Sequence, residues 1–278
     1  MTKAFHQLLA AAVLFPLSSI AYAEIAGVSP AEIAKDSALA RSNSVQLGYS
    51  LDSYSQYFSD NPIATLKYGR ITSWGSLSIQ ANSSNRRQTS DTQYEINVYP
   101  KLWKSSWAEL NLGTSAGNLF ALNSQGAEVF SSLENGYEAS IGLRHLAFLN
   151  SAVTLYTGSL SKYAGNYLFT VRPYVTPSSI GTSISGNIKI TRYFSDADHF
   201  LRLNASAGKS AEERTFANIP PQAVTLRSRS LGITGQWSPR IGVFISPSFG
   251  HERQEVLFSP GEFVGIDKFS ATISYRFK

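Results

Sequence analysis

The sequence lacks cysteine, and its single methionine is the first residue. A chain without cysteine cannot form disulfides, a thiolate metal site or a cysteine nucleophile. Charged residues are also scarce: Asp, Glu, Lys and Arg account for 15% of the 278 residues, whereas an average soluble domain has roughly 25%. Aromatic residues, by contrast, make up 12% of the chain, with 14 Tyr and 16 Phe.

The first 23 residues have the organisation of a secretory signal peptide. A short segment containing Lys3 precedes an apolar run from Leu8 to Phe15, and Ala21-Tyr22-Ala23 supplies the small-residue pattern of a cleavage site. The apolar run is too short to cross a bilayer as a retained helix. We therefore expect cleavage after Ala23 and export of the mature chain.

Residues 24–43 differ in pattern from everything that follows. Ser29 and Glu32 match a helix capping box, and Pro30 suits a first helical position. We expect a short periplasmic segment with a helix from Pro30 to about Arg41. It either contacts a partner or the mouth of the domain that follows, or it is a loosely ordered leader, because isolated helices of this length are marginal in water.

From Ser44 onward the hydrophobic pattern repeats every two residues. Between residues 137 and 144, Tyr, Ala, Ile and Leu alternate with Glu, Ser, Gly and Arg. Such alternation is typical of strands with one apolar and one polar face. The same alternation recurs in residues 45–51, 93–98, 184–191, 201–206 and 269–277.

A long series of alternating strands in an exported chain fits either a soluble sandwich or propeller, or a transmembrane β-barrel. Segments of about 8 to 11 residues match the length that crosses a bilayer when tilted, and aromatic residues near strand ends match the interfacial girdles of such barrels. We therefore predict an all-β fold, a transmembrane antiparallel β-barrel over residues 44–278. The predicted girdle residues are Trp74, Tyr99, Trp103, Trp107, Tyr163, Tyr167, Tyr193, Trp237 and Tyr275.

Turn signals divide this region into about fourteen strands; twelve and sixteen are the alternatives, because single barrel strands give weak signals. Connections after even-numbered strands are mostly short, as at 70–73, whereas those after odd-numbered strands are often long and polar, as at 83–91, 208–224 and 251–267. Short periplasmic turns and longer outer loops are typical of outer-membrane barrels. Pro247 falls inside a predicted strand, where it cannot donate to the ladder, so we expect a β-bulge there.

Four segments resemble the YaiO family of outer-membrane β-barrels: TQYEINVYPKL at 92–102, SSLENGYEASIGLRHL at 131–146, LYTGSLSKYAGNYLFTVRPYVTP at 155–177 and RYFSDADHFLRLNASAG at 192–208. The run GNYLFTVRPYVTP is the most specific element. The resemblance implies a barrel inserted from the periplasm by the barrel-assembly machinery. The C-terminal FSATISYRFK is similar to the assembly signal of such proteins, except that Lys278 follows the terminal aromatic Phe277.

The family resemblance brings no established reaction and no catalytic residues. Relatives found beside sugar-transferring enzymes imply exopolysaccharide machinery as a partner. From the residues, a Ser–His pair built on His145 or His251 is conceivable at the outer rim, but a histidine at headgroup level is the simpler interpretation. The spacing GxSxG occurs once, as GTSAG at 113–117, but no amphipathic helix follows it to form a nucleophile elbow, and no HExxH motif occurs. We therefore expect no enzymatic activity, no metal and no cofactor.

Charged residues on the lumen-facing positions divide into an acidic and a basic wall. Their arrangement fits either a polar passage that selects a solute or a ladder of interior ion pairs that fills the barrel, because a buried charge needs a partner. The predicted lumen charge ladder consists of Lys67, Glu95, Glu109, Glu138, Arg144, Arg172, Lys189, Arg202 and Arg276.

Two outward-facing arginines, Arg227 and Arg229, lie just above the apolar Leu231 and Ile233. We expect them to contact lipopolysaccharide, because arginine suits phosphate oxygens. The net charge of +5 does not indicate nucleic-acid binding, since the bases are spread over the chain. The sequence thus predicts an outer-membrane barrel, either structural or surface-associated with a closed lumen, or a conduit for polysaccharide or another polar solute.

Overall fold

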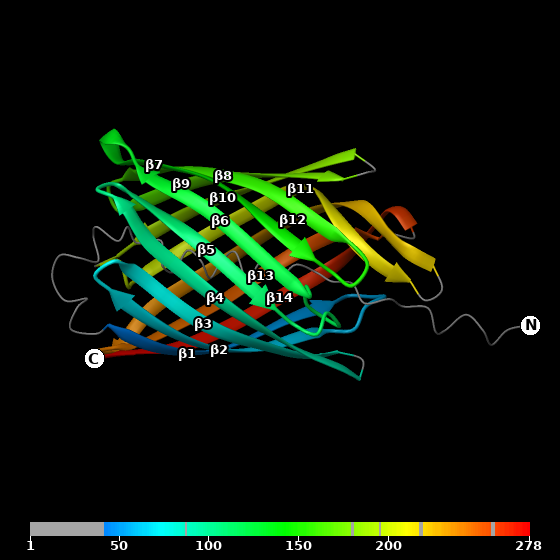
Figure 1. The fold of residues 1–278 in the computed structure, drawn as a ribbon, viewed down its shortest axis with the longest axis horizontal. Coiled ribbons are helices and arrows are strands. Elements are labelled where there is room, and N and C mark those ends of the chain that lie inside the picture. The colour runs from blue at the N-terminus through cyan, green and yellow to red at the C-terminus, as the bar shows by residue number, and fades with distance from the viewer. Residues whose placement is uncertain (1–41, 87, 179–180, 195, 217–218, 257–258) are drawn as a thin grey trace, which may run out of the picture.

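The alternating segments form fourteen antiparallel strands in the computed structural model, which describes residues 42–86, 88–178, 181–194, 196–216, 219–256 and 259–278 (Figure 1). The predicted fold class and strand number are confirmed. One 3₁₀ turn, η3 (Glu134–Gly136), joins two of the strands. The strands are β1 (Asn43–Tyr54), β2 (Asn61–Thr72), β3 (Gly75–Arg86), β4 (Thr89–Trp103), β5 (Ser106–Thr114), β6 (Asn123–Ser132), β7 (Tyr137–Ala147), β8 (Ala152–Ala164), β9 (Tyr167–Ser178), β10 (Gly181–Tyr193), β11 (Phe200–Phe216), β12 (Ile219–Arg240), β13 (Val243–Val256) and β14 (Ser259–Phe277).

Pairing between β1 and β14 closes the sheet into a barrel. Their register runs without a break from Asn43↔Phe277 to Tyr54↔Ile266. Because every strand is hydrogen-bonded on both sides, the barrel has no exposed edge. The even strand number places Asn43 and Phe277 at the same end, which we call the turn end; the opposite end is the hairpin end (Figure 1).

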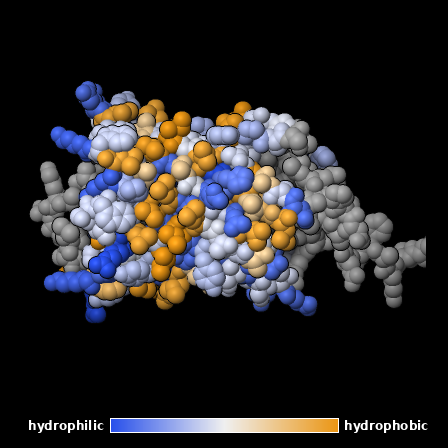
Figure 2. Space-filling view, in the orientation of Figure 1, coloured by the Kyte–Doolittle hydropathy of each residue, from blue (hydrophilic) through white to orange (hydrophobic). Residues whose placement is uncertain are grey.

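The outward face of the barrel wall is apolar. Figure 2 shows hydrophobic side chains gathered in a band across the wall, with hydrophilic side chains beyond it at the turn end. Ile141 is 75% exposed and Ile188 53% exposed. A soluble monomer rarely exposes so large an apolar surface, so this band is suited to lipid hydrocarbon.

The hairpin end is built from strand extensions rather than from the predicted loops. The segment 83–91 is a tight hairpin between β3 and β4, and most of 208–224 and 251–267 is strand. As a result β11, β12 and β14 have 17, 22 and 19 residues. Beyond the membrane the outward face of a strand meets water, so the outward apolar alternation disappears although backbone pairing continues. Residues 217–218 and 257–258, at two hairpin tips, lie outside the described residues.

Pro247 lies in a gap in the ladder, and the expected β-bulge there is wrong. The β12–β13 ladder passes from Thr234↔Ser248 to Trp237↔Ile245 in unchanged register. The missing N–H therefore leaves a short unpaired stretch, without an inserted residue. Pro100 and Pro173 lie in similar gaps of the β4–β5 and β8–β9 ladders.

The predicted signal peptide and the helix expected at Pro30–Arg41 fall on residues 1–41, outside the described residues. In the part of the chain that the structure describes, no helix is long and apolar enough to span a bilayer.

We expect the hairpin end to face the cell exterior. Because the chain has no cysteine, single cysteines give a clean test. Asn150→Cys, in the exposed loop between β7 and β8, should react with a membrane-impermeant maleimide on intact cells. Lys104→Cys, in the exposed turn between β4 and β5, should react only after the outer membrane is permeabilised. The opposite labelling pattern would reverse the proposed orientation.

Candidate functional site: the charged lumen

Side chains that point away from the lipid-facing band meet inside the barrel and form two walls of opposite charge. The acids come from four consecutive strands, β4 to β7, and three bases come from β9 to β11. This arrangement follows from strand pleating, because a polar side chain on the alternate position can only face the lumen. The residues lining this part of the lumen include Lys67, Glu95, Glu109, Glu128, Glu138, Arg144, Arg172, Lys189 and Arg202.

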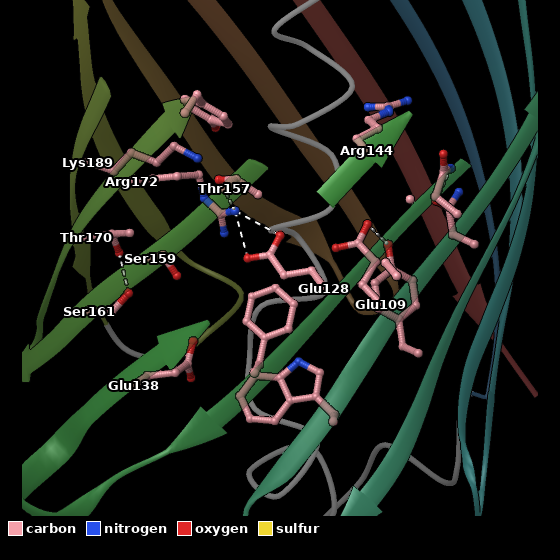
Figure 3. A pocket seen from close by; sticks show the side chains of 18 of the residues that line it. Glu109, Glu128, Glu138, Arg144, Thr157, Ser159, Ser161, Thr170, Arg172 and Lys189 are labelled. Atoms are coloured by element: carbon pink, nitrogen blue, oxygen red, sulfur yellow. Dashed lines mark hydrogen bonds and ion pairs between the residues drawn. The ribbon is translucent and has the colours of Figure 1, made fainter. Parts of the chain in front are cut away.

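A close ion pair in the lumen joins Arg172 on β9 to Glu128 on β6. Nη1 of Arg172 lies 2.8 Å from Oε1 and 2.9 Å from Oε2 of Glu128, and the two side chains are only 6% and 13% exposed. Figure 3 shows both side chains reaching toward one another across the intervening strands. Gly142 lies opposite Glu128 on β7, and a Cβ there would lie 2.6 Å from Cβ of Glu128, so glycine makes room for the pair.

A second polar network surrounds Glu95 on β4. Its Oε1 lies 3.4 Å from Nη2 of Arg144, and its Oε2 accepts hydrogen bonds from Asn82 at 3.2 Å and Gln80 at 3.4 Å. The Glu95 side chain is 4% exposed. Buried carboxylates need such partners, because an unpaired buried charge is strongly unfavourable. The network supplies these partners to Glu95.

Two adjacent cavities remain in the lumen, one between the two walls and the other between the basic wall and β12–β14, β1 and β2. One has a volume of about 140 Å³ and the other about 180 Å³. Tyr174, Lys189 and Arg202 line both. A water molecule needs roughly 10–15 Å³ of such volume, so each cavity has room for several waters. Side chains therefore do not fill the lumen completely.

Glu128 is absent from the predicted lumen charge ladder, although its place in the strand alternation indicates that it faces the lumen. Val129 and Ala127 face outward, so Glu128 has lumen parity. Lys268 on β14, which lies 2.9 Å from Glu252 and 3.8 Å from Asp52, was also missed. Glu252 was assigned to an outer loop, because the extension of β13 carries no apolar alternation.

Arg276 lies apart from the other predicted ladder residues, at the turn end. Its Nη1 is 2.9 Å from Oδ1 of Asp198, in the turn between β10 and β11, and its guanidinium lies over the Phe244 ring, 4.1 Å from the centroid. The pair links β14 to a turn that is distant along the sheet. Arg276 therefore connects two parts of the barrel wall at the turn end.

Part of the predicted aromatic girdle points inward instead. Trp107 and Tyr99 are 7% and 9% exposed, and both line the lumen together with Tyr193. The Trp107 ring stacks on Phe130, with centroids 5.4 Å apart. These aromatics narrow the lumen near the turn end. The outward girdle is formed by exposed residues at the same end, including Trp74, Trp103, Tyr167, Trp237 and Tyr275.

An apolar cluster packs inside the hairpin end. Tyr54, Val256, Val264 and Ile266 form it, with Phe58 packed against them; Val264 and Ile266 are fully buried. Nearby, the Glu262 carboxylate accepts a hydrogen bond from the Tyr57 hydroxyl, which raises the pKa of Tyr57 and ties the β1–β2 loop to β14.

Asp91, on the lumen-facing side of β4, organises the loop between β5 and β6. Its Oδ2 accepts the backbone N–H groups of Asn118 and Leu119 at 2.9 Å and of Phe120 at 3.2 Å, and its Oδ1 accepts that of Ala116 at 3.2 Å. One carboxylate thereby satisfies four backbone donors that would otherwise need water. The loop is held at the hairpin end with Phe120 buried.

The two rim histidines are bonded through Nδ1. His145 lies 2.8 Å from Oγ1 of Thr154, and His251 lies 2.7 Å from Oδ1 of Asp267. Within the described residues, no hydroxyl group is hydrogen-bonded to Nε2 of either ring. The same residues contain no group of three or more potential metal-ligating side chains.

Arg227 and Arg229 lie on the exposed outer face of β12 near the hairpin end. Arg86, expected in an outer loop, instead lies on β3 with its side chain buried. Its guanidinium lies over the Tyr54 ring, 5.4 Å from the centroid.

Solved structures share this fold. The COG4313 outer membrane channel from Pseudomonas putida F1 superposes with a TM-score of 0.54 at 8% identity, covering 85% of this chain and 96% of that chain. Omp33 of Acinetobacter baumannii, an outer membrane protein, superposes with a TM-score of 0.51 at 9% identity, covering 85% of this chain and 98% of that chain. No protein with a curated description matches the sequence.

A closed barrel with a lipid-facing band and a polar lumen, shared with outer-membrane proteins of known structure, defines the chain as an outer-membrane β-barrel protein. Residues 42–213 match the YaiO membrane beta barrel domain. The chain therefore belongs to the YaiO family, as its four resembling segments predicted.

Proposed function

We propose that this protein is a non-enzymatic outer-membrane barrel with a closed, ion-paired lumen, and that it has a structural or surface role in the cell envelope. It reaches the membrane after signal cleavage at Ala23 and insertion by the barrel-assembly machinery. The observation that carries the proposal is the buried, two-oxygen contact between Arg172 and Glu128 across the lumen.

Both ends of the barrel support a closed lumen. The apolar cluster of Tyr54, Val256, Val264 and Ile266 occupies the inside of the hairpin end. Inward aromatics and the Arg276–Asp198 pair occupy the turn end. Ion pairs between these two ends join strands that are not adjacent in the sheet, β9 with β6 and β7 with β4, and so make the barrel rigid.

The absence of catalysis is supported by the bonding of the rim histidines. A serine hydrolase needs a histidine nitrogen that takes the proton of the nucleophile. In the described part of the chain, Nε2 of His145 and of His251 has no hydroxyl partner. We propose headgroup contact for both rings and for Arg227 and Arg229.

A second candidate function is a conduit for a polar solute. The two cavities that share Tyr174, Lys189 and Arg202 favour it, because a passage that holds water between charged side chains suits polysaccharide hydroxyl groups. Movement of the apolar cluster at the hairpin end would then open the path. Exopolysaccharide machinery is the partner that the family resemblance suggests for this alternative.

Single-channel recording separates the two functions. The purified protein in planar bilayers should give no stable conductance steps if the lumen is closed. The same recording is made on a variant that lacks residues 116–120, the loop held by Asp91. A small conductance in that variant alone would show that the lumen is closed at the hairpin end. Regular conductance steps in the unmodified protein would favour the conduit and contradict the closed lumen.

A further inference from the structure

Four cations on the outward face of β11, β12 and β13 are arranged as two directly opposed pairs. Lys209 on β11 is the cross-strand partner of Arg227 on β12, and Arg229 on β12 is the partner of Arg253 on β13. All four side chains are exposed. The two pairs occupy successive outward positions of β12, so the four charges form one patch, which we call the cation patch.

Opposed like charges on one sheet face are destabilising, and among the side chains that the structure describes Glu255 offsets the patch only in part. Glu255 is the acid beside it, but its oxygens accept the backbone N–H groups of Arg227 at 3.2 Å and Gly261 at 3.0 Å. Its Oε2 lies 3.9 Å from Nε of Arg227, beyond hydrogen-bond distance. Arg253 lies over the Phe263 ring at 5.9 Å, which leaves its donors available.

The position of the cation patch relative to the apolar band indicates which kind of ligand it can bind. Leu231, 64% exposed, is the next outward residue below Arg229, and Ile233 and Phe249 follow as cross-strand partners within the band. Two residues of strand rise roughly 7 Å. The cation patch therefore lies at the height of lipid headgroups, on the wall and outside the lumen.

We propose that the cation patch binds the phosphate groups of lipid A in the outer leaflet. Guanidinium groups form forked hydrogen bonds with phosphate oxygens. A phosphate between two opposed cations attracts both, and this attraction outweighs the repulsion between them. Lipid A carries its phosphates at the headgroup boundary, where the patch lies. The inference rests on the proposed outward orientation of the hairpin end, but is independent of whether the lumen is open.

The test uses the full chain folded in phosphatidylcholine vesicles with and without diphosphorylated lipid A. The double variant Arg229→Gln/Arg253→Gln should bind fluorescent lipid A about tenfold or more weakly, because charge-assisted hydrogen bonds are lost. Without lipid A the same variant should unfold at a higher urea concentration than the unmodified protein, because the opposed charges are gone. With lipid A present, the unmodified protein should instead unfold at the higher urea concentration.

Arg192→Gln is the matched control, since Arg192 is an exposed arginine at the turn end that lies over Tyr167 and Phe194; its lipid A affinity should not change. Equal affinity of the double variant and the unmodified protein would overturn the proposal. Equal binding of dephosphorylated lipid A would also overturn it, as would equal binding of phosphatidylglycerol, which would reveal a general attraction for anions. The maleimide labelling at Asn150 tests the orientation separately.

Discussion

Replacing Arg172 with glutamine should destabilise the folded barrel by roughly 3–5 kcal/mol, the usual cost of leaving one member of a buried ion pair without its partner. Glu128 would keep its charge in a site where its side chain is 13% exposed, and the amide of glutamine is too short and uncharged to replace the guanidinium. The midpoint of urea unfolding in lipid vesicles measures the effect.

A double-mutant cycle with Glu128→Gln makes this result specific to the pair. Removing both charges should recover part of the loss, because neither charge is then left alone. Arg240→Gln, at an exposed position of the turn end, removes a cation of the same kind and should leave the midpoint unchanged. An unchanged midpoint for Arg172→Gln, together with altered ion selectivity of a conducting barrel, would show that water screens the charges and that the lumen is a passage.

Placing arginine at Ile141 should destabilise the barrel by about 2–4 kcal/mol, the cost of a cation on the lipid face near the bilayer midplane. Ile141 lies in the middle of β7 and is 75% exposed on the outward face. In lipid that exposure becomes contact with hydrocarbon, from which a guanidinium can escape only by deforming the bilayer.

Leu133→Arg provides the matched comparison for this change. Leu133 precedes η3 in the turn between β6 and β7 and is 50% exposed, so arginine there meets headgroups and water and should cost about 0–1 kcal/mol. Reversible unfolding in vesicles measures both. Equal stability of Ile141→Arg and the unmodified protein would mean that β7 presents its other face to lipid.

Much of the fold follows from local patterns in the sequence. Side chains on a strand alternate between two faces, so the residues 137–144 alone indicate that Ile141 faces lipid and that Arg144 faces the lumen. Turn residues between alternating segments gave the correct strand number. The family was also recognisable from short runs such as GNYLFTVRPYVTP.

The hairpin end could not be predicted in this way, for a physical reason. Outside the bilayer the outward face of a strand meets water, so the requirement for outward apolar residues ends while the hydrogen-bonded ladder continues. The extended parts of β11, β12 and β14 therefore read as polar loops. The inward positions of Tyr99 and Trp107 were obscured because an aromatic residue near a strand end suits either face.

The partners inside the lumen depend on closure of the barrel. Alternation indicates that Arg172 and Glu128 both point inward, but their meeting across β7 and β8 depends on the tilt and stagger of the strands, which closure sets. The same holds for Asp91, whose carboxylate reaches backbone groups of a loop more than 20 residues away in sequence. Local sequence thus assigns each side chain to a face, whereas the closed sheet assigns each charge its neighbour, because strand pairing and tilt bring together residues that are distant along the chain.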